Sequence, residues 1–149
     1  MKPTPKGWPR ISVSLYYDDP RAAIDWLCKA FGFEVRLLVE GEGGGVEHSE
    51  LTIGGEGTVM VSGGPKAGKF AYRRTPSQVG GGNTQNMMVY VDDVDAHCER
   101  AAAAGAKVTL PLETHDYGED YWSDRGYECA DVGGHHWYFA ERLQSGKSA

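Results

Sequence analysis

The sequence has few cysteines, a shortage of basic residues and no long hydrophobic run, and each shortage excludes a class of protein. Its three cysteines, Cys28, Cys98 and Cys129, form no closely spaced pair, which predicts reduced thiols rather than a disulfide framework or a zinc site. Lysine and arginine total 15 against 21 acidic residues, and the resulting net charge of −6 argues against nucleic acid as a partner. No apolar segment approaches the ~18 residues that span a bilayer, so no membrane partner is expected.

The sequence also lacks a secretory leader and the motifs of two enzyme classes. No apolar segment follows the lysine and proline residues of 1–10, which predicts a cytoplasmic protein. A GxSxG nucleophile motif is absent, and the glycine clusters do not fit the GxxxxGK[ST] pattern of a phosphate-binding loop. Serine hydrolases and P-loop nucleotide-binding proteins are therefore excluded.

An internal repeat is the most informative feature that is present. Residues 15–19 read LYYDD and residues 89–93 read VYVDD, each between an alternating run and a helical segment of about a dozen residues. Three further strands are predicted after each helix, at 33–40, 47–53 and 58–62 and again at 107–113, 125–131 and 136–140. The predicted fold class is α+β, with two β-α-β-β-β modules forming a curved mixed sheet or barrel-like cavity with the helices outside.

Both helices carry start signals and one apolar stripe. Asp19 and Asp93 are suitable N-cap residues. Cys28 and Cys98 fall on the inner stripes, which predicts small core residues, whereas a reactive thiol at Cys129 remains an alternative. His97 falls on the outer side of the second helix, where we expect it to be exposed.

The composition divides the chain into an N-terminal arm (1–10), a first module (11–62), a linker (63–82), a second module (83–142) and a tail (143–149). The two modules and the linker together form one expected domain, 11–142, because a half of this size buries too little surface alone. The linker is rich in glycine and basic residues. We interpret it as mobile, with a lid over a site as the alternative.

Alternation along the strands separates an apolar face from a mixed face. The apolar set should pack under the helices and contains Val13, Leu15, Tyr17, Val59, Val61, Met87, Val89, Val91, Trp137 and Phe139. The mixed set carries hydroxyls, an amide, thioethers and phenols and contains Ser12, Ser14, Tyr16, Thr58, Met60, Ser62, Asn86, Met88, Tyr90, His136 and Tyr138. Such a mixture is typical of a ligand cavity, although a core with mutually satisfied hydroxyls is the alternative.

The stretch 113–131 combines many acidic residues with aromatic rings, among them Trp122. This combination suits a flat cationic ligand through charge and cation–π contacts, which makes Trp122 a candidate ligand-binding residue. The alternative is a solvated loop with Trp122 at the edge of a dimer.

Two sequence motifs and the duplicated β-α-β-β-β module resemble those of a known family. The segments YVDDVDAHCERAAAAGA (90–106) and ADVGGHHWYFAE (130–141) resemble those of the vicinal oxygen chelate superfamily. This superfamily includes glyoxalase I, fosfomycin and bleomycin resistance proteins, and extradiol dioxygenases. The resemblance implies a homodimer and a divalent metal held by the first and fourth strands of each module, positions that fall here on Ser12, Met60, Asn86 and Tyr138. None of these is a histidine or a carboxylate, so we expect the metal site to be degenerate and no cofactor to be held there.

The favoured function is therefore the binding of a small organic molecule in the sheet cavity, for sequestration or resistance. One alternative is a metal-dependent lyase, isomerase or dioxygenase that uses displaced ligands, His48, Glu50 and His136, although His48 and Glu50 are more simply a solvated pair. Another is a metal-free enzyme with His136 or Tyr138 as the acid–base group. A third is an interaction module whose partner surface is marked by Trp8, Trp26 and Trp122.

Overall fold

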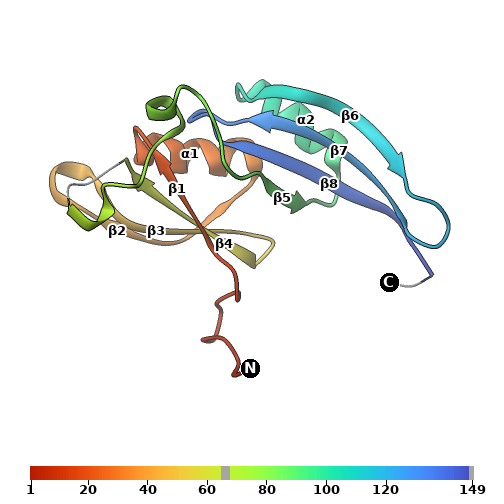
Figure 1. The fold of residues 1–149 in the computed structure, drawn as a ribbon, viewed down its shortest axis with the longest axis horizontal. Coiled ribbons are helices and arrows are strands. Elements are labelled where there is room, and N and C mark those ends of the chain that lie inside the picture. Colours follow the sequence, from red (N-terminus) through yellow and green to blue (C-terminus); the bar gives the residue numbers. More distant parts are fainter. Residues whose placement is uncertain (65–67, 148–149) are drawn as a thin grey trace. The chain divides into compact units, whose positions relative to one another are not determined.

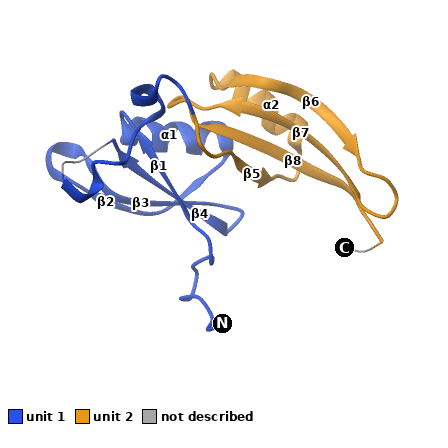
Figure 2. Ribbon diagram, viewed as in Figure 1, with its two compact units in different colours: residues 1–82 blue, residues 83–149 orange. Residues whose placement is uncertain are grey.

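The computed structural model describes residues 1–64 and 68–147, which fold as two compact units (Figure 2). Unit 1 comprises residues 1–82 and unit 2 residues 83–149. Each unit has the element order β-α-β-β-β (Figure 1), so the two predicted modules are confirmed. Lys66 of the predicted linker lies outside the described residues.

Each unit forms its own mixed sheet of four strands. Unit 1 contains β1 (Val13–Tyr17), α1 (Pro20–Phe31), β2 (Glu34–Glu40), β3 (Val46–Ile53) and β4 (Glu56–Gly63). Unit 2 contains β5 (Met87–Tyr90), α2 (Val94–Ala103), β6 (Lys107–Asp116), β7 (Trp122–Ala130) and β8 (His136–Ser145). The strand orders are β1-β4-β3-β2 and β5-β8-β7-β6, in which β1–β4 and β5–β8 are parallel and the other pairs antiparallel. The described strands thus form two open sheets and no closed barrel.

The predicted helix caps are present. The side chain of Asp19 accepts a hydrogen bond from the Ala22 amide at 3.0 Å, and Asp93 accepts one from the Ala96 amide at 2.9 Å. Gly32 ends α1 in the left-handed conformation, with φ of 77°, which a residue without a Cβ adopts at little cost. These local signals fix where each helix begins and where α1 ends.

Each helix packs on one face of the sheet of its own unit. The apolar set predicted from alternation supplies much of this packing, since Leu15, Tyr17, Val59, Val61, Trp137 and Phe139 are buried. The opposite face of each sheet is called here the helix-free face. It carries the mixed set of side chains.

The prediction that His97 is exposed is wrong. The residue is only 4% exposed, its ring lies 4.1 Å from the ring of Phe139, and its Nδ1 lies 2.7 Å from the hydroxyl of Tyr127. The alanine-rich helix α2 presents little side-chain volume, so the imidazole fills space between helix and sheet.

Burial also raises the pKa of Cys129 to about 12, which keeps this thiol protonated and argues against a reactive cysteine.

The acidic stretch 113–131 is a hairpin rather than a solvated loop. Strand β6 continues to Asp116, β7 starts at Trp122, and the Tyr117 amide donates to the Trp122 carbonyl at 2.9 Å. The two strands predicted at 107–113 and 125–131 thus each extend three residues further toward the turn than expected. No helix in the described part of the chain is long and apolar enough to cross a membrane.

The DVGGHHW segment has a structural role at the turn into β8. The carboxylate of Asp131 accepts hydrogen bonds from the amides of Gly133 and His135, at 2.8 and 3.0 Å. It also accepts one from the indole N–H of the fully buried Trp137 at 2.9 Å. This motif therefore positions the start of β8, where His136 begins the strand.

Candidate functional site

A carboxylate that the sequence analysis did not single out organises the helix-free face of unit 2. Glu128 on β7 accepts hydrogen bonds from Asn86 Nδ2 and Thr109 Oγ1, both at 2.9 Å, and lies 3.0 Å from Nδ1 of His136. These contacts, that with His136 foremost, lower the pKa of Glu128. The side chains of Glu128 and His136 are 19% and 33% exposed, so the pair borders solvent without being fully solvated. The cluster is therefore a charged and pre-oriented group on which two predicted site residues converge.

An open pocket of about 430 Å³ lies beside this cluster. It is lined by Asn83, Thr84, Gln85, Asn86 and His136. Its size falls within the range of small-molecule sites, and amide, hydroxyl and imidazole groups converge on it. The segment before β5 thus contributes polar groups that alternation along the strands did not reveal.

A second cluster on unit 2 joins Tyr90 and Trp122 through an ion pair. Arg142 on β8 pairs with the carboxylate of Asp124, which is only 8% exposed, and Arg142 also donates to the hydroxyl of Tyr90. The hydroxyl of Tyr90 in turn donates to Asp124 at 3.0 Å. The guanidinium of Arg142 lies 5.1 Å from the ring of Trp122. Trp122 is thus held by a cation of its own unit, which competes with the predicted cationic ligand.

The side chain of Tyr138 reaches over Gly126 of β7, although its register partner on that strand is Glu128. A Cβ at Gly126 would come within 2.5 Å of the Tyr138 hydroxyl oxygen. Met88 is the register neighbour of Tyr138 on the adjacent strand β5. The phenol therefore sits flat against the sheet, and burial raises its pKa above the ordinary value of 10.

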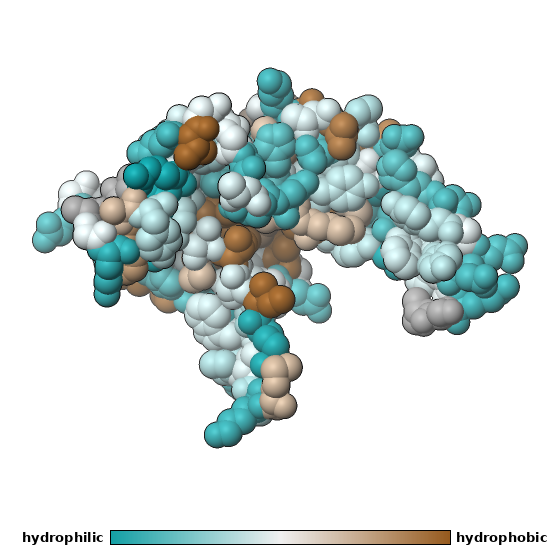
Figure 3. Space-filling model, in the orientation of Figure 1, coloured by the Kyte–Doolittle hydropathy of each residue, from teal (hydrophilic) through white to brown (hydrophobic). Residues whose placement is uncertain are grey.

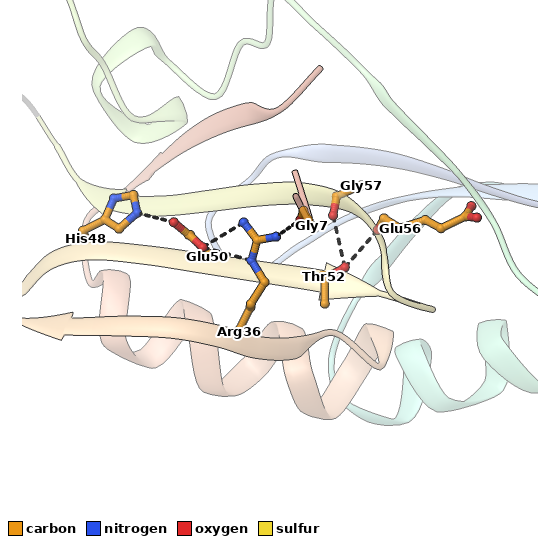
Figure 4. Close-up of polar contacts among 7 residues, drawn as sticks. All are labelled: Gly7, Arg36, His48, Glu50, Thr52, Glu56 and Gly57. Carbon is orange, nitrogen blue, oxygen red and sulfur yellow. Dashed lines mark hydrogen bonds and ion pairs between the residues drawn. The ribbon is translucent and has the colours of Figure 1, made fainter. Parts of the chain in front are cut away.

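On unit 1, Glu50 of β3 is the centre of a comparable cluster (Figure 4). Arg36 on β2 donates to its carboxylate at 2.9 Å, and Nε2 of His48 lies 2.9 Å away on the other side. The contact with His48, and then that with Arg36, lowers the pKa of Glu50. Arg36 also donates to the carbonyl of Gly7 and lies 4.4 Å from the ring of Trp8, which ties the N-terminal arm to the sheet.

The structure corrects the interpretation of His48 and Glu50. They share one face, as predicted, but only His48 is solvated: its side chain is 40% exposed, whereas that of Glu50 is 8% exposed. Its burial follows from the bound Arg36, which neutralises the charge. The described residues contain no group of three or more His, Cys, Asp or Glu that could hold a metal, so the displaced set with His136 gains no support.

The other predicted site residues of unit 1 lie on its first and fourth strands. Ser14 of β1 and Met60 of β4 are register neighbours, and Tyr16 follows on the same face. Ser12 directly precedes β1. The structure therefore brings Ser14 and Met60 together, next to Tyr16.

The positions at which the superfamily holds a metal do not fit a divalent cation. Met60 offers a soft neutral thioether, and Ser12 a weak neutral hydroxyl. The raised pKa of Tyr138 disfavours the phenolate that would bind well, and the amide of Asn86 already donates to Glu128. The chemistry of these donors suits hydrogen bonding to an organic molecule better than coordination.

The three tryptophans proposed for a partner surface make contacts within their own units. Trp8 lies against Arg36 and Trp122 against Arg142, while Trp26 of α1 makes an edge contact of 4.9 Å with a ring of the same helix. Figure 3 shows hydrophobic residues in separate patches among hydrophilic ones in this view. These contacts give the interaction module no support, although Trp122 remains 39% exposed.

Strand alternation was the signal that could have revealed the missed residues. Asp124, Gly126 and Glu128 share one face of β7, and Arg142 lies on the neighbouring β8. The predicted strand at 125–131 already contained Gly126 and Glu128, but alternation was not applied to it. Thr109 could not be found in this way, because its contact with Glu128 depends on the pairing of β6 with β7.

Comparison with known proteins gives relatives over most of the chain. Two mycobacterial relatives, uncharacterized protein Rv0887c of Mycobacterium tuberculosis and uncharacterized protein Mb0911c of Mycobacterium bovis, are each 36% identical over 136 residues. The matched part is 91% of this chain and 76% and 85%, respectively, of the relatives.

Solved structures show the same fold. The crystal structure of TioX from Micromonospora sp. ML1 is 34% identical, with a TM-score of 0.67 over 89% of this chain and 95% of that one. The fosfomycin resistance protein FosX from Mesorhizobium loti is 14% identical, with a TM-score of 0.57 over 89% and 91% of the two chains, a likeness in fold alone.

The family comparison agrees with the paired modules and with the motifs around residues 90–106 and 130–141. The family model described as "Glyoxalase/Bleomycin resistance protein/Dioxygenase superfamily" matches residues 11–139. The chain belongs to this superfamily.

Proposed function

We propose that this protein binds a small organic molecule on the helix-free faces of its sheets, without a metal at the superfamily's ligand positions, and sequesters it. The observation that carries the proposal is the Glu128 cluster, which orients Asn86 and His136 at the edge of the 430 Å³ pocket. The proposed ligand-binding residues are Ser12, Ser14, Tyr16, Met60, Asn86, Met88, Tyr90, Trp122, His136 and Tyr138. Resistance to a toxic compound, a cytoplasmic location and a homodimer belong to the same proposal.

The arrangement of unit 2 supports binding in two ways. Its hydrogen-bonding groups are held in place before a ligand arrives, which lowers the entropy lost on binding. Next to them stand the thioether of Met88, which is 55% exposed, and the ring of Tyr138, and both offer apolar contact. Such a combination fixes the orientation of a ligand through few polar groups and obtains affinity from apolar contact.

Native mass spectrometry of the freshly purified protein, with a metal assay, tests this proposal. We expect an organic adduct, either retained from the cell or taken up from a small-molecule extract of it. Asn86→Ala and His136→Ala should each weaken the adduct by about tenfold, because each removes an oriented hydrogen bond. Gln144→Ala, at an exposed position near the end of β8, is the matched control and should retain it.

Two results would contradict the proposal. One is a divalent ion that stays bound, one per chain, after dialysis and is lost in the Asn86→Ala variant. The other is the absence of any organic adduct both before and after incubation with the extract.

A second candidate function, metal-free proton transfer, is favoured by one contact. The 3.0 Å distance between Glu128 and Nδ1 of His136 fits a tautomer in which Nδ1–H donates to the carboxylate and Nε2 is left as the basic atom. A carboxylate that holds an imidazole in this way is a common element of general-base sites. Glu128 would then be a positioning residue and His136 the catalytic one.

The tautomer of His136 tests this candidate without a known substrate. Nitrogen-15 chemical shifts at neutral pH should report the Nδ1–H form in the wild type, and Glu128→Gln should shift the population toward the Nε2–H form. Glu50→Gln, on the other unit, should leave His136 unchanged. A wild-type His136 that is already in the Nε2–H form would rule out this role for Glu128.

A further inference from the structure

One stretch of this acidic chain carries basic residues and no acidic ones. Residues 57–91 contain no aspartate or glutamate, but they include Lys66, Lys69, Arg73 and Arg74. Of these four cations, Lys69, Arg73 and Arg74 lie among the described residues. A local excess of positive charge in a chain of net charge −6 favours an anion at this place.

The segment that carries Arg73 is anchored to the end of β1 in unit 1. Thr75 Oγ1 donates to the carboxylate of Asp18 at 2.8 Å and Ser77 Oγ donates to it at 2.7 Å. Thr75 caps the 3-10 helix Pro76–Val79, and its backbone amide donates to the side-chain oxygen of Gln78. Thr75 is only 1% exposed. Asp18 is thus engaged by hydroxyl groups next to the place where Arg73 approaches the sheet.

Arg73 itself lies among aromatic rings and has no ionic partner among the residues that the structure describes. Its Cζ atom is 3.9 Å from the ring centre of Phe70, 5.2 Å from that of Tyr16 and 5.9 Å from that of Tyr72. Its Nε is buried and has no hydrogen-bond partner within residues 1–64 and 68–147. Other arginines of the chain, such as Arg142, form ion pairs with carboxylates.

Cation–π contacts hold the guanidinium in place, but they do not satisfy its N–H donors. A buried donor without an acceptor is unfavourable. Arg73 as a whole is only half-buried, so a ligand can still reach the part of its side chain that is exposed. The fixed fork of an arginine pairs best with a planar carboxylate that accepts two parallel hydrogen bonds. Arg74 is less available for this role, because it donates to the carbonyl groups of Ala71 and Arg73.

We propose that Arg73 is the anion subsite of unit 1 and binds the carboxylate of an organic ligand whose aromatic body packs beside Tyr16. The assignment rests on the proposed function in treating the helix-free face of unit 1 as a ligand surface. A single unpaired guanidinium among rings fits a monoanion with an apolar body, whereas a phosphate dianion usually engages several cations or backbone amides. The ligand class is therefore an aromatic carboxylate.

A titration with benzoate, followed through the arginine Nε–H resonances in nitrogen-15 NMR spectra, tests the subsite. We expect a saturable shift of the Arg73 resonance, and no such shift with benzamide, which has the same ring but no charge. Arg73→Gln should weaken benzoate binding, followed through backbone amide shifts, by about tenfold or more. Arg73→Lys, which keeps the charge but lacks the fork, should give an intermediate affinity.

Arg10→Gln is the matched control, since it removes an exposed arginine of unit 1 and should leave benzoate affinity unchanged. The subsite is overturned if benzamide binds as well as benzoate, if Arg73→Gln retains the affinity, or if benzoate does not saturate. Should Arg73→Gln fail to fold, the comparison of Arg73→Lys with the wild type decides. This titration reports on Arg73 alone, whereas native mass spectrometry reports on a retained ligand, so the subsite and the proposed function can fail separately.

Discussion

At the scale of single residues, the position of Tyr138 depends on the absence of a side chain at Gly126. A Cβ there would lie 2.5 Å from the Tyr138 hydroxyl and 2.8 Å from the backbone oxygen of Phe139. Gly126→Ala should therefore lower the free energy of unfolding by about 1–3 kcal/mol, because neither the ring nor the strand can yield freely. Urea denaturation measures this loss, and a changed ring-proton spectrum of Tyr138 would report the displaced phenol.

Gly63→Ala supplies the control for this prediction. Gly63 also lies in a strand, but a Cβ there would meet only Pro20, at an ordinary distance of 3.9 Å. It should change the free energy of unfolding by no more than about 0.5 kcal/mol. Equal losses in the two variants would show that general strand propensity, and not the contact with Tyr138, determines the effect.

At the scale of elements, the sequence predicted the features that depend on neighbouring residues, namely the helix caps and the buried face of each strand. The caps at Asp19 and Asp93 and the burial of Leu15 and Val61 depend on a few neighbouring residues or on strict alternation, so they could be recognised. The order β-α-β-β-β followed from the repetition of those signals. Element order and the two faces were therefore predictable from the residues alone.

What depends on pairing between distant strands was not predicted. The meeting of Asn86, Thr109 and His136 at Glu128 requires the register of four strands, and the sequence does not encode that register locally. The burial of His97 likewise depends on how closely α2 approaches its sheet. The candidate site was thus predicted as a face, but its central carboxylate was missed.

The segment after β4 also makes long-range contacts that could not be predicted from the sequence. Its glycines and basic residues suggested a mobile linker, whereas Thr75 and Ser77 bind Asp18 far away in the sequence. No local pattern marks Asp18 as the acceptor, since it directly precedes the helix cap Asp19. Side-chain contacts of this kind become visible only once the chain has folded.

At the scale of the whole molecule, four carboxylates in the described part of the chain have pKa values below their ordinary range. Ser77 and Thr75 lower the pKa of Asp18, and Arg125 lowers that of Asp95. Glu50 and Glu128 are lowered mainly by their histidine partners. A carboxyl group with a depressed pKa in the folded state stabilises the protein above its unfolded pKa, and this contribution disappears as the pH falls through the folded value.

The free energy of unfolding should therefore fall as the pH is lowered from about 5 to about 3, because the unfolded chain takes up protons more readily than the folded one. Urea denaturation at several pH values measures this decline. Glu50→Gln should make the decline shallower, since it removes one of the linked protons, whereas Glu34→Gln, at an exposed position on β2, should leave it unchanged. A free energy that is constant over this range, or an equal effect of both variants, would mean that the contacts of Glu50 with His48 and Arg36 do not stabilise the fold.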